Sequence, residues 1–163
     1  MKHEYTHFLI REKIGKYEIP MWLDEGLAEY VAYSLPPFEM EKSYLGFGDM
    51  YFREAINNNE LIDWDILFRT DRRYFLSLPE KERSYKFRLA YSQCFTFVKF
   101  LIDTYGIEKL FNLLEIFSHN DNLKEVFEIV YEEGFEKIEK KWFELQKAHL
   151  SSKMKAGWQT TPF

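Results

Sequence analysis

The sequence predicts a mainly α-helical domain, and three observations support this fold class. Apolar residues recur at helical spacing along most of the chain, and no segment shows the strict alternation typical of a strand. Hydrophobic residues make up 46% of the 163 residues, which is enough to fill a single core. Aromatic residues account for 19%, so large rings should dominate that core. We therefore expect one multi-helix domain over residues 1–150, followed by a C-terminal tail over residues 151–163.

Glycine, proline and capping residues divide the first half of the chain into helices. Gly15 should end the first helix, and Pro20, whose ring is accommodated in a first helical turn, should begin the second. Asp49 and Asp63 can each cap a helix, because a carboxylate there accepts a backbone N–H of the first turn. The segment 38–48 has the composition of a loop. The expected helices span residues 2–12, 20–34 and 49–58, with a short one after 63.

The second half of the chain should hold a long central helix and three further helices. Gly106 is placed to end the long helix with a left-handed cap, and Gly134 separates the last two helices. The expected helices begin at 81 or 84 and run to 105, then span 107–117, 122–133 and 135–150. The apolar positions of the long helix are Phe87, Ala90, Cys94, Val98 and Leu101, and those of the last helix are Ile138, Trp142 and Leu145.

Charge and cysteine content exclude several classes of protein. A net charge of −5 with both signs interspersed argues against a nucleic-acid partner. The single cysteine, Cys94, excludes an intrachain disulfide and a cysteine-based zinc site, and we expect it to be a buried apolar residue. No run approaches the roughly 18 apolar residues of a membrane span, and no signal peptide follows the polar start. The compartment and the oligomeric state stay undetermined; an extracytoplasmic location would need an upstream segment.

The string His3-Glu4-Tyr5-Thr6-His7 places two histidines on one face of a predicted helix. Residues four apart are helix neighbours, with Cβ atoms about 5–6 Å from each other, so both imidazoles can reach one zinc ion. Glu4 would then stand beside the metal, where a general base can take a proton from the activated water. The alternative is a pair of surface histidines on an N-terminal helix.

A third ligand is offered by Glu25 in the second predicted helix. It precedes Gly26, and a glycine inside a helix costs about 1 kcal/mol relative to alanine, so a close approach between backbones is expected there. We expect Gly26 and Ala28 to let this helix lie tightly against the first and bring Glu25 to the metal. Two histidines and one glutamate are a known ligand set of catalytic zinc.

Two acidic neighbours of Glu25 and two further histidines complete the candidates. Glu29 lies four residues after Glu25 and is expected to orient His3 or His7 by accepting its outer ring N–H; the alternative is an exposed helix carboxylate. Asp24 is expected to point elsewhere and to be solvated. The remaining histidines, His119 and His149, are expected at the surface.

Together these strings resemble the gluzincin metallopeptidases, most closely the peptidase MA-like domain family, relatives of the M1 aminopeptidases. The resemblance rests on the H-E-x-x-H string and on an E-G-x-A string that is separated from it by 17 residues. It implies a zincin-type catalytic core in which His3, His7 and Glu25 bind one zinc ion and Glu4 is the general base. The β-sheet that precedes this motif in the family has no counterpart here. We therefore expect an N-terminally truncated piece that lacks the upstream sheet.

The resemblance extends to residues 90–101, which match a family helix that carries a tyrosine before an apolar run. It implies that Tyr91 donates a hydrogen bond to the oxyanion of the tetrahedral intermediate. The alternative is a tyrosine at the edge of the core whose hydroxyl is satisfied elsewhere.

The expected function is that of a zinc-dependent peptidase, which hydrolyses a peptide or protein substrate by metal-activated water. One alternative is a catalytically inactive, zinc-binding, peptidase-like module that acts in protein binding or assembly. Another is a helical domain in which the motif is accidental. The G-x-M-E-N type motif of M1 exopeptidases is absent from the sequence, so the choice between endo- and exopeptidase stays open.

Overall fold

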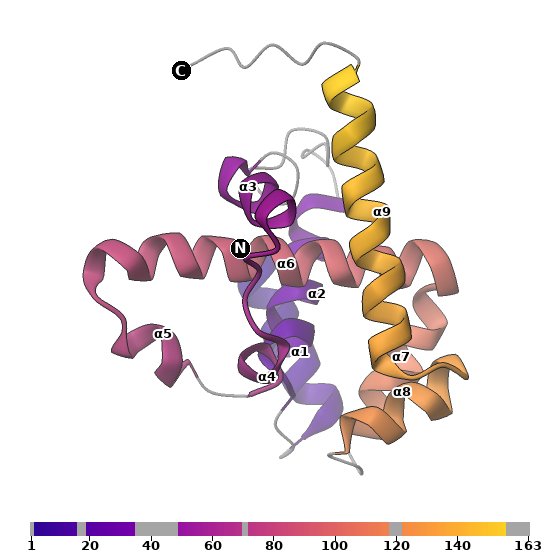
Figure 1. The fold of residues 1–163 in the computed structure, drawn as a ribbon. Coiled ribbons are helices and arrows are strands. Elements are labelled where there is room, and N and C mark those ends of the chain that lie inside the picture. The colour runs from indigo at the N-terminus through magenta and orange to yellow at the C-terminus, as the bar shows by residue number, and fades with distance from the viewer. Residues whose placement is uncertain (1, 16–18, 35–48, 70–71, 118–121, 156–163) are drawn as a thin grey trace.

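The structure is a computed structural model that describes residues 2–15, 19–34, 49–69, 72–117 and 122–155. These residues form nine α-helices and no strand, which confirms the mainly α fold class (Figure 1). The helices are α1 (Lys2–Ile14), α2 (Met21–Ser34), α3 (Met50–Asn58), α4 (Trp64–Leu67), α5 (Arg73–Ser77), α6 (Glu80–Tyr105), α7 (Ile107–Phe117), α8 (Leu123–Tyr131) and α9 (Phe135–Lys155).

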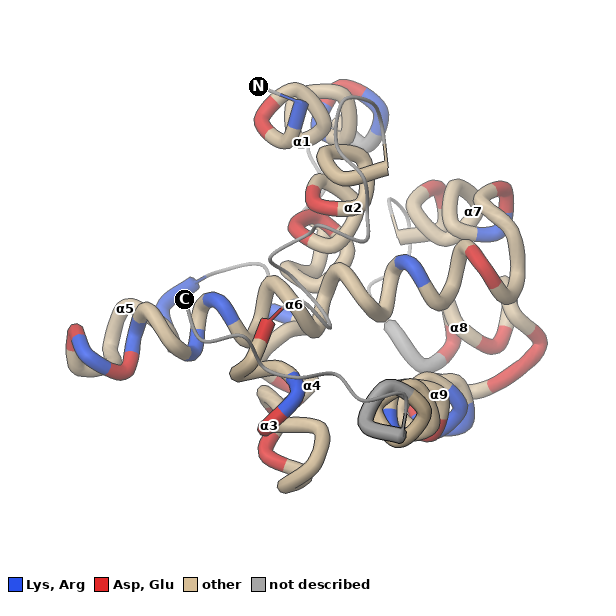
Figure 2. Tube along the Cα trace, turned by 90° about the horizontal axis from the view of Figure 1, so that it is seen from above, with Lys and Arg blue, Asp and Glu red and all other residues tan. Residues whose placement is uncertain are grey.

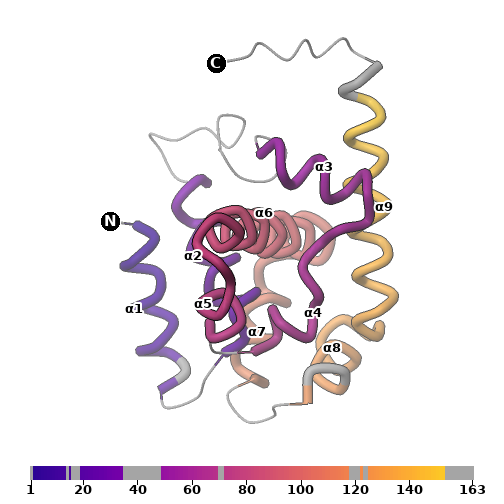
Figure 3. The backbone as a smooth tube through the Cα atoms, turned by 60° about the vertical axis from the view of Figure 1, so that its left-hand side comes forward, coloured from indigo at the N-terminus to yellow at the C-terminus, as the bar shows by residue number. Residues whose placement is uncertain are grey.

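The longest helix, α6, runs through the middle of the molecule and the other helices surround it. Figure 3 looks along α6 and shows α2 between α1 and α6, with α9 on the opposite side of α6. Helix α2 packs on both α1 and α6, while α3, α5 and α7 also contact α6. Acidic and basic residues are distributed over the outer helices instead of gathering on one of them (Figure 2). Within the described part of the chain, no helix is both long enough and apolar enough to cross a bilayer.

The core is built from aromatic rings, as the composition predicts. Phe97 of α6 is fully buried at its centre, and its ring centroid lies 5.3 Å from that of Trp22, 4.6 Å from Trp64 and 5.7 Å from Trp142. These three rings come from α2, α4 and α9, so a single side chain of α6 joins elements from both ends of the chain. Because such rings bury large apolar areas, this cluster fixes α2 on one face of α6.

Gly26 is the point of closest approach between α2 and α6. A Cβ atom added there would lie 2.6 Å from the carbonyl oxygen of Cys94 and 2.6 Å from Cγ2 of Val98, so only glycine fits. The predicted close approach is therefore present, but the prediction that it faces the first helix is wrong. Helix α2 presses its glycine against α6 and turns a different face toward α1. Cys94 is buried, as predicted.

The predicted caps of the early helices are confirmed. Asp49 precedes α3 and its carboxylate accepts a 3.0 Å hydrogen bond from the backbone N–H of Tyr51. Asn59 ends that helix with a left-handed φ of 58°. Asp63 caps α4 by accepting a 2.8 Å hydrogen bond from the backbone N–H of Asp65. These short helices therefore begin and end where local chemistry places them.

Several details of the later elements differ from the predictions. Gly106 ends α6 with a φ of 89°, but its ψ of 155° lies outside the left-handed helical region. Helix α5 was not predicted; it is held by buried Phe75, whose ring stacks 4.6 Å from that of Phe87 in α6. That contact joins two distant parts of the chain, so no local pattern reveals it.

Helix α9 is longer than predicted and buries a different face. It continues past Leu150 to Lys155. The prediction that Leu145 faces the core is wrong, because Leu145 is 52% exposed and Gln146 is buried instead. Gln146 lies four residues after the buried Trp142 and Leu145 three, and the packed face of α9 follows the spacing of four. The division of the chain at residue 150 stays a prediction. The predicted loop 38–48 lies outside the described residues.

Candidate metal centre

Three side chains from α1 and α2 converge on one point between the two helices. His3 and His7 lie one turn apart on α1, and their Nε2 atoms are 3.0 Å from each other. Oε2 of Glu25, on α2, lies 3.4 Å from Nε2 of His3 and 3.5 Å from Nε2 of His7. His7 and Glu25 are buried, at 7% and 1% exposure, and His3 is partly buried. The structure thus brings together the three residues that the sequence pattern selects, and one ligand atom from each lies within 4.8 Å of the others.

The geometry of this cluster fits a divalent cation. Oε2 of Glu25 is buried, and no group in the described part of the chain gives it a hydrogen bond. A buried polar atom without a partner costs about 1–3 kcal/mol, and more when it carries charge. The three facing atoms are a carboxylate oxygen and two imidazole nitrogens, which are the common donors to catalytic zinc. A zinc ion held between them would satisfy all three atoms at once.

Carboxylates of α2 contact the outer nitrogens of both histidines. Oε1 of Glu29 lies 3.2 Å from Nδ1 of His3, and this contact is the main reason why the pKa of His3 is raised, against the lowering effect of its burial. Nδ1 of His7 lies 2.6 Å from Oδ1 of Asp24 and donates a hydrogen bond to it. With both Nδ1 atoms turned to carboxylates, both Nε2 atoms are left to face Glu25.

The prediction that Asp24 points away from the centre is wrong. Its position relative to Glu25 predicts only a neighbour about 100° round the same helix, because an α-helix has 3.6 residues per turn. The crossing of α1 over α2 brings His7 over this neighbouring position, so Asp24 reaches the histidine that Glu29 does not. The acidic Asp24-Glu25 pair directly before Gly26 was the available signal.

Arg72 is a contact of the centre that the sequence pattern did not reveal. It precedes α5, and Nη2 of its guanidinium forms an ion pair with Oε1 of Glu25. Its side chain is 47% exposed, whereas the carboxylate that it meets is almost fully buried. Glu25 and Arg72 lie 47 positions apart in the chain. Arg72 precedes α5, a helix that the sequence does not predict.

Both predicted catalytic side chains lie at the edge of the centre. Glu4 is exposed on α1, and its charge raises the pKa of His3 and of Tyr91, though in each case it is a minor cause. Tyr91 of α6 is partly buried, and its ring centroid lies 6.4 Å from that of His3 with the planes 29° apart. Burial is the main reason why the pKa of Tyr91 is raised, so its phenol stays protonated at neutral pH and can donate a hydrogen bond.

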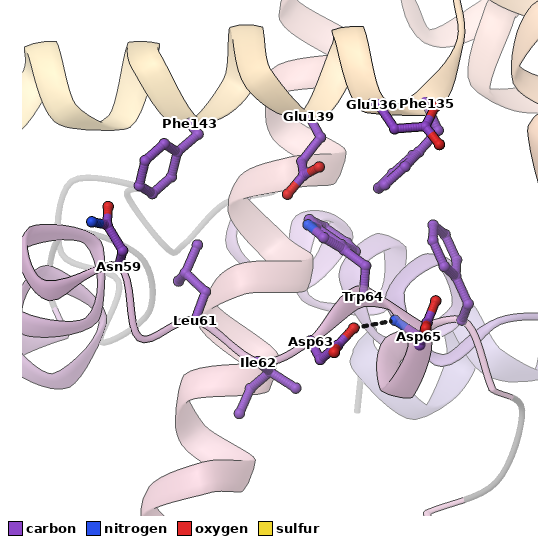
Figure 4. Close-up of a pocket in the computed structure, with 11 residues that line it drawn as sticks. Asn59, Leu61, Ile62, Asp63, Trp64, Asp65, Phe135, Glu136, Glu139 and Phe143 are labelled. Carbon is purple, nitrogen blue, oxygen red and sulfur yellow. Dashed lines mark hydrogen bonds between the residues drawn. The ribbon is translucent and has the colours of Figure 1, made fainter.

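The remaining candidates lie elsewhere. His149 is exposed, as predicted, and His119 lies outside the described residues. A separate cavity of about 530 Å³ opens between residues 59–68 and α9, where Glu139 projects beside the ring of Trp64 (Figure 4). It shares no lining residue with the histidine cluster and carries acidic and aromatic side chains together.

Comparison with known proteins gives the family to which this helical domain belongs. Residues 1–148 match the family model of the Peptidase MA superfamily, and the chain belongs to this superfamily. The matched range contains every residue of the cluster and every helix that supports it. No curated protein and no solved structure gives a significant match to the chain.

Proposed function

We propose that this chain is a zinc-dependent peptidase of the gluzincin type, in which His3, His7 and Glu25 hold one zinc ion. The observation that carries the proposal concerns Oε2 of Glu25, which is buried, accepts no hydrogen bond from the described residues and faces the Nε2 atoms of both histidines at 3.4 and 3.5 Å. Membership of a peptidase superfamily supports hydrolysis of a peptide or protein substrate. The donor set is one that catalytic zinc sites use.

The chemistry of the proposed reaction divides between the metal and the side chains around it. Zinc bound here supplies Lewis acidity, which lowers the pKa of water toward about 7 and polarises a carbonyl group. Glu4, exposed at the rim, accepts the proton of the attacking water and later delivers it to the leaving amine. The protonated phenol of Tyr91 donates a hydrogen bond to the developing oxyanion.

The carboxylates of α2 support this arrangement by directing the imidazoles. Glu29 and Asp24 each contact an Nδ1 atom, which fixes the tautomer and leaves the opposite nitrogen free of a proton. One helix thus supplies a ligand and both orienting groups, while α1 supplies the two histidines. Because α1 and α2 pack directly on each other, one contact between helices holds the ligands and their orienting groups together.

A Glu4→Gln variant separates metal binding from catalysis. Because Glu4 is not a ligand in the proposal, the variant should keep one zinc per chain by elemental analysis. Its hydrolysis of a peptide library should fall by about 10²- to 10⁴-fold, since the base is lost. Glu12→Gln, an exposed acid on the same helix, is the matched control and should hydrolyse the library as the wild type does.

Three other outcomes would contradict the proposal in different ways. Wild-type protein that holds zinc and binds peptides, but cleaves none of a broad library, would support the inactive zinc-binding module. Wild-type protein that takes up no zinc would remove the metal centre itself. Undiminished turnover in Glu4→Gln would assign the base to another residue.

A further inference from the structure

We propose that Arg72 is a positioning residue that restricts Glu25 to holding the metal through a single oxygen. The inference rests on the zinc site proposed above and adds a second requirement to it. In this view the glutamate is a ligand with one oxygen available and one oxygen already engaged.

The two oxygens of the Glu25 carboxylate face different groups. Oε1 is engaged by the guanidinium of Arg72. Oε2 accepts no hydrogen bond from the described part of the chain and faces the two histidines of α1. A carboxylate whose oxygens are divided in this way presents one donor atom to a metal, because turning the second oxygen inward would break the ion pair.

Arg72 is held in place from both sides. Three residues earlier, the carbonyl oxygen of Arg69 accepts a 2.9 Å hydrogen bond from the backbone N–H of Met21, the first residue of α2. Three residues later, Phe75 is fully buried and stacks on Phe87 of α6. Described residues on both sides of Arg72 therefore contact the helix of Glu25 or the helix behind it, and α5 follows Arg72 directly.

Arginine suits this role better than other cations. Its guanidinium is always charged and presents a rigid fork of donors to a carboxylate. Glu25 is 1% exposed, and an ionised carboxylate at that depth needs a partner charge. Arg72 supplies that charge from the solvent side, so Oε2 is left for the metal.

The consequence for the site is a low number of protein donor atoms. Two imidazole nitrogens and one carboxylate oxygen leave open positions for water and for the substrate oxygen, which catalytic zinc requires. A carboxylate released from Arg72 can rotate and offer both oxygens. The extra donor would then occupy a position that the reaction needs.

The visible absorption of Co²⁺ tests this inference without relying on activity. Cobalt replaces zinc in such sites, and its absorption weakens as the coordination number rises from four to five. The full chain loaded with one Co²⁺ should absorb several-fold more strongly as wild type than as Arg72→Ala at equal occupancy. Arg72→Lys should restore part of the intensity, because an ammonium group can still engage Oε1 without the fork geometry.

Controls distinguish positioning from charge and from misfolding. Arg69→Ala removes the same charge from an exposed arginine nearby and should keep the wild-type spectrum. An equal intensity loss in Arg69→Ala, or an unchanged spectrum in Arg72→Ala, would overturn the role of Arg72 and leave the metal site standing. Wild-type protein that takes up no Co²⁺ or Zn²⁺ would instead overturn the proposed function. If Arg72→Ala does not fold by circular dichroism, Arg72→Gln and Arg72→Lys decide by the same comparison.

Discussion

At the scale of single residues, each side chain of the centre uses its two nitrogen or oxygen atoms to contact two different groups. Each histidine turns one nitrogen to a carboxylate and the other to Glu25, and Glu25 turns one oxygen to Arg72 and the other to the histidines. The outward-facing nitrogens and Oε1 therefore have partners, whereas Oε2 of Glu25 and the two Nε2 atoms face one another and Oε2 accepts no hydrogen bond from the described residues. This division of partners is what we expect of a metal site and not of acidic and basic side chains that meet by chance.

The hydrogen bond from His7 to Asp24 gives the first prediction at this scale. Asp24→Ala should weaken zinc binding by about 10- to 100-fold, the usual effect of removing a group that orients a ligand. Glu29→Ala should have a smaller effect, because its contact is longer, at 3.2 Å against 2.6 Å, and its histidine is less buried. Zinc titration against a competing chelator measures both, with Glu12→Ala as the control. Equal affinity in Asp24→Ala and wild type would show that His7 needs no such partner.

At the scale of elements, α2 determines the site because it packs on α6 and also contacts the histidines of α1. It meets α6 at Gly26, and a different part of its surface carries Asp24, Glu25 and Glu29 toward α1. Any change that pushes α2 away from α6 must also move Glu25 relative to the histidines. If the proposed metal centre is correct, packing and metal binding are coupled through this one helix.

Gly26→Ala tests this coupling. The added Cβ would lie 2.6 Å from a backbone carbonyl that cannot move aside easily. Overpacking costs about 1–3 kcal/mol, and the gain of about 1 kcal/mol in helix propensity offsets part of that cost. Unfolding in urea should therefore show a net loss of up to about 2 kcal/mol. Zinc affinity should fall as well. Gly134→Ala meets only flexible carboxylates at 3.7 Å and should change stability by less than about 0.5 kcal/mol. A stable Gly26→Ala with normal zinc affinity would contradict the coupling.

The elements and site residues that could be predicted from the sequence are those set by local chemistry. Asp49 and Asn59 bound a helix through their own side chain and backbone, and the spacing of His3 and His7 follows from one helical turn. Helix α5, the partner of His7 and the contact of Arg72 with Glu25 could not be predicted, because each depends on how separate helices cross.

At the scale of the whole molecule, the two helices that carry the histidines and Glu25 differ in how firmly the fold holds them. Helix α2 lies between α1 and α6, whereas α1 lies at the outside and has its main contact with α2 (Figure 3). Tyr5, Phe8 and Leu9 of α1 are large apolar residues that stay exposed. Burial therefore stabilises α1 less than it stabilises α2. A metal that joins His3 and His7 to Glu25 would add a further link between α1 and α2.

Zinc removal should consequently loosen α1 more than any other described helix. At a free zinc concentration of about 100 times the Kd, the free energy of unfolding should rise by about 2.7 kcal/mol over the metal-free protein. Hydrogen exchange followed by mass spectrometry should show the largest added protection in peptides that cover α1, and little in those that cover α9, which lies on the far side of α6. Glu25→Gln keeps the size of the side chain but lacks the anionic ligand, so zinc should give it little protection. If one bound zinc leaves exchange in α1 unchanged, then α1 is already held by packing alone and the metal adds no structural link between the two helices.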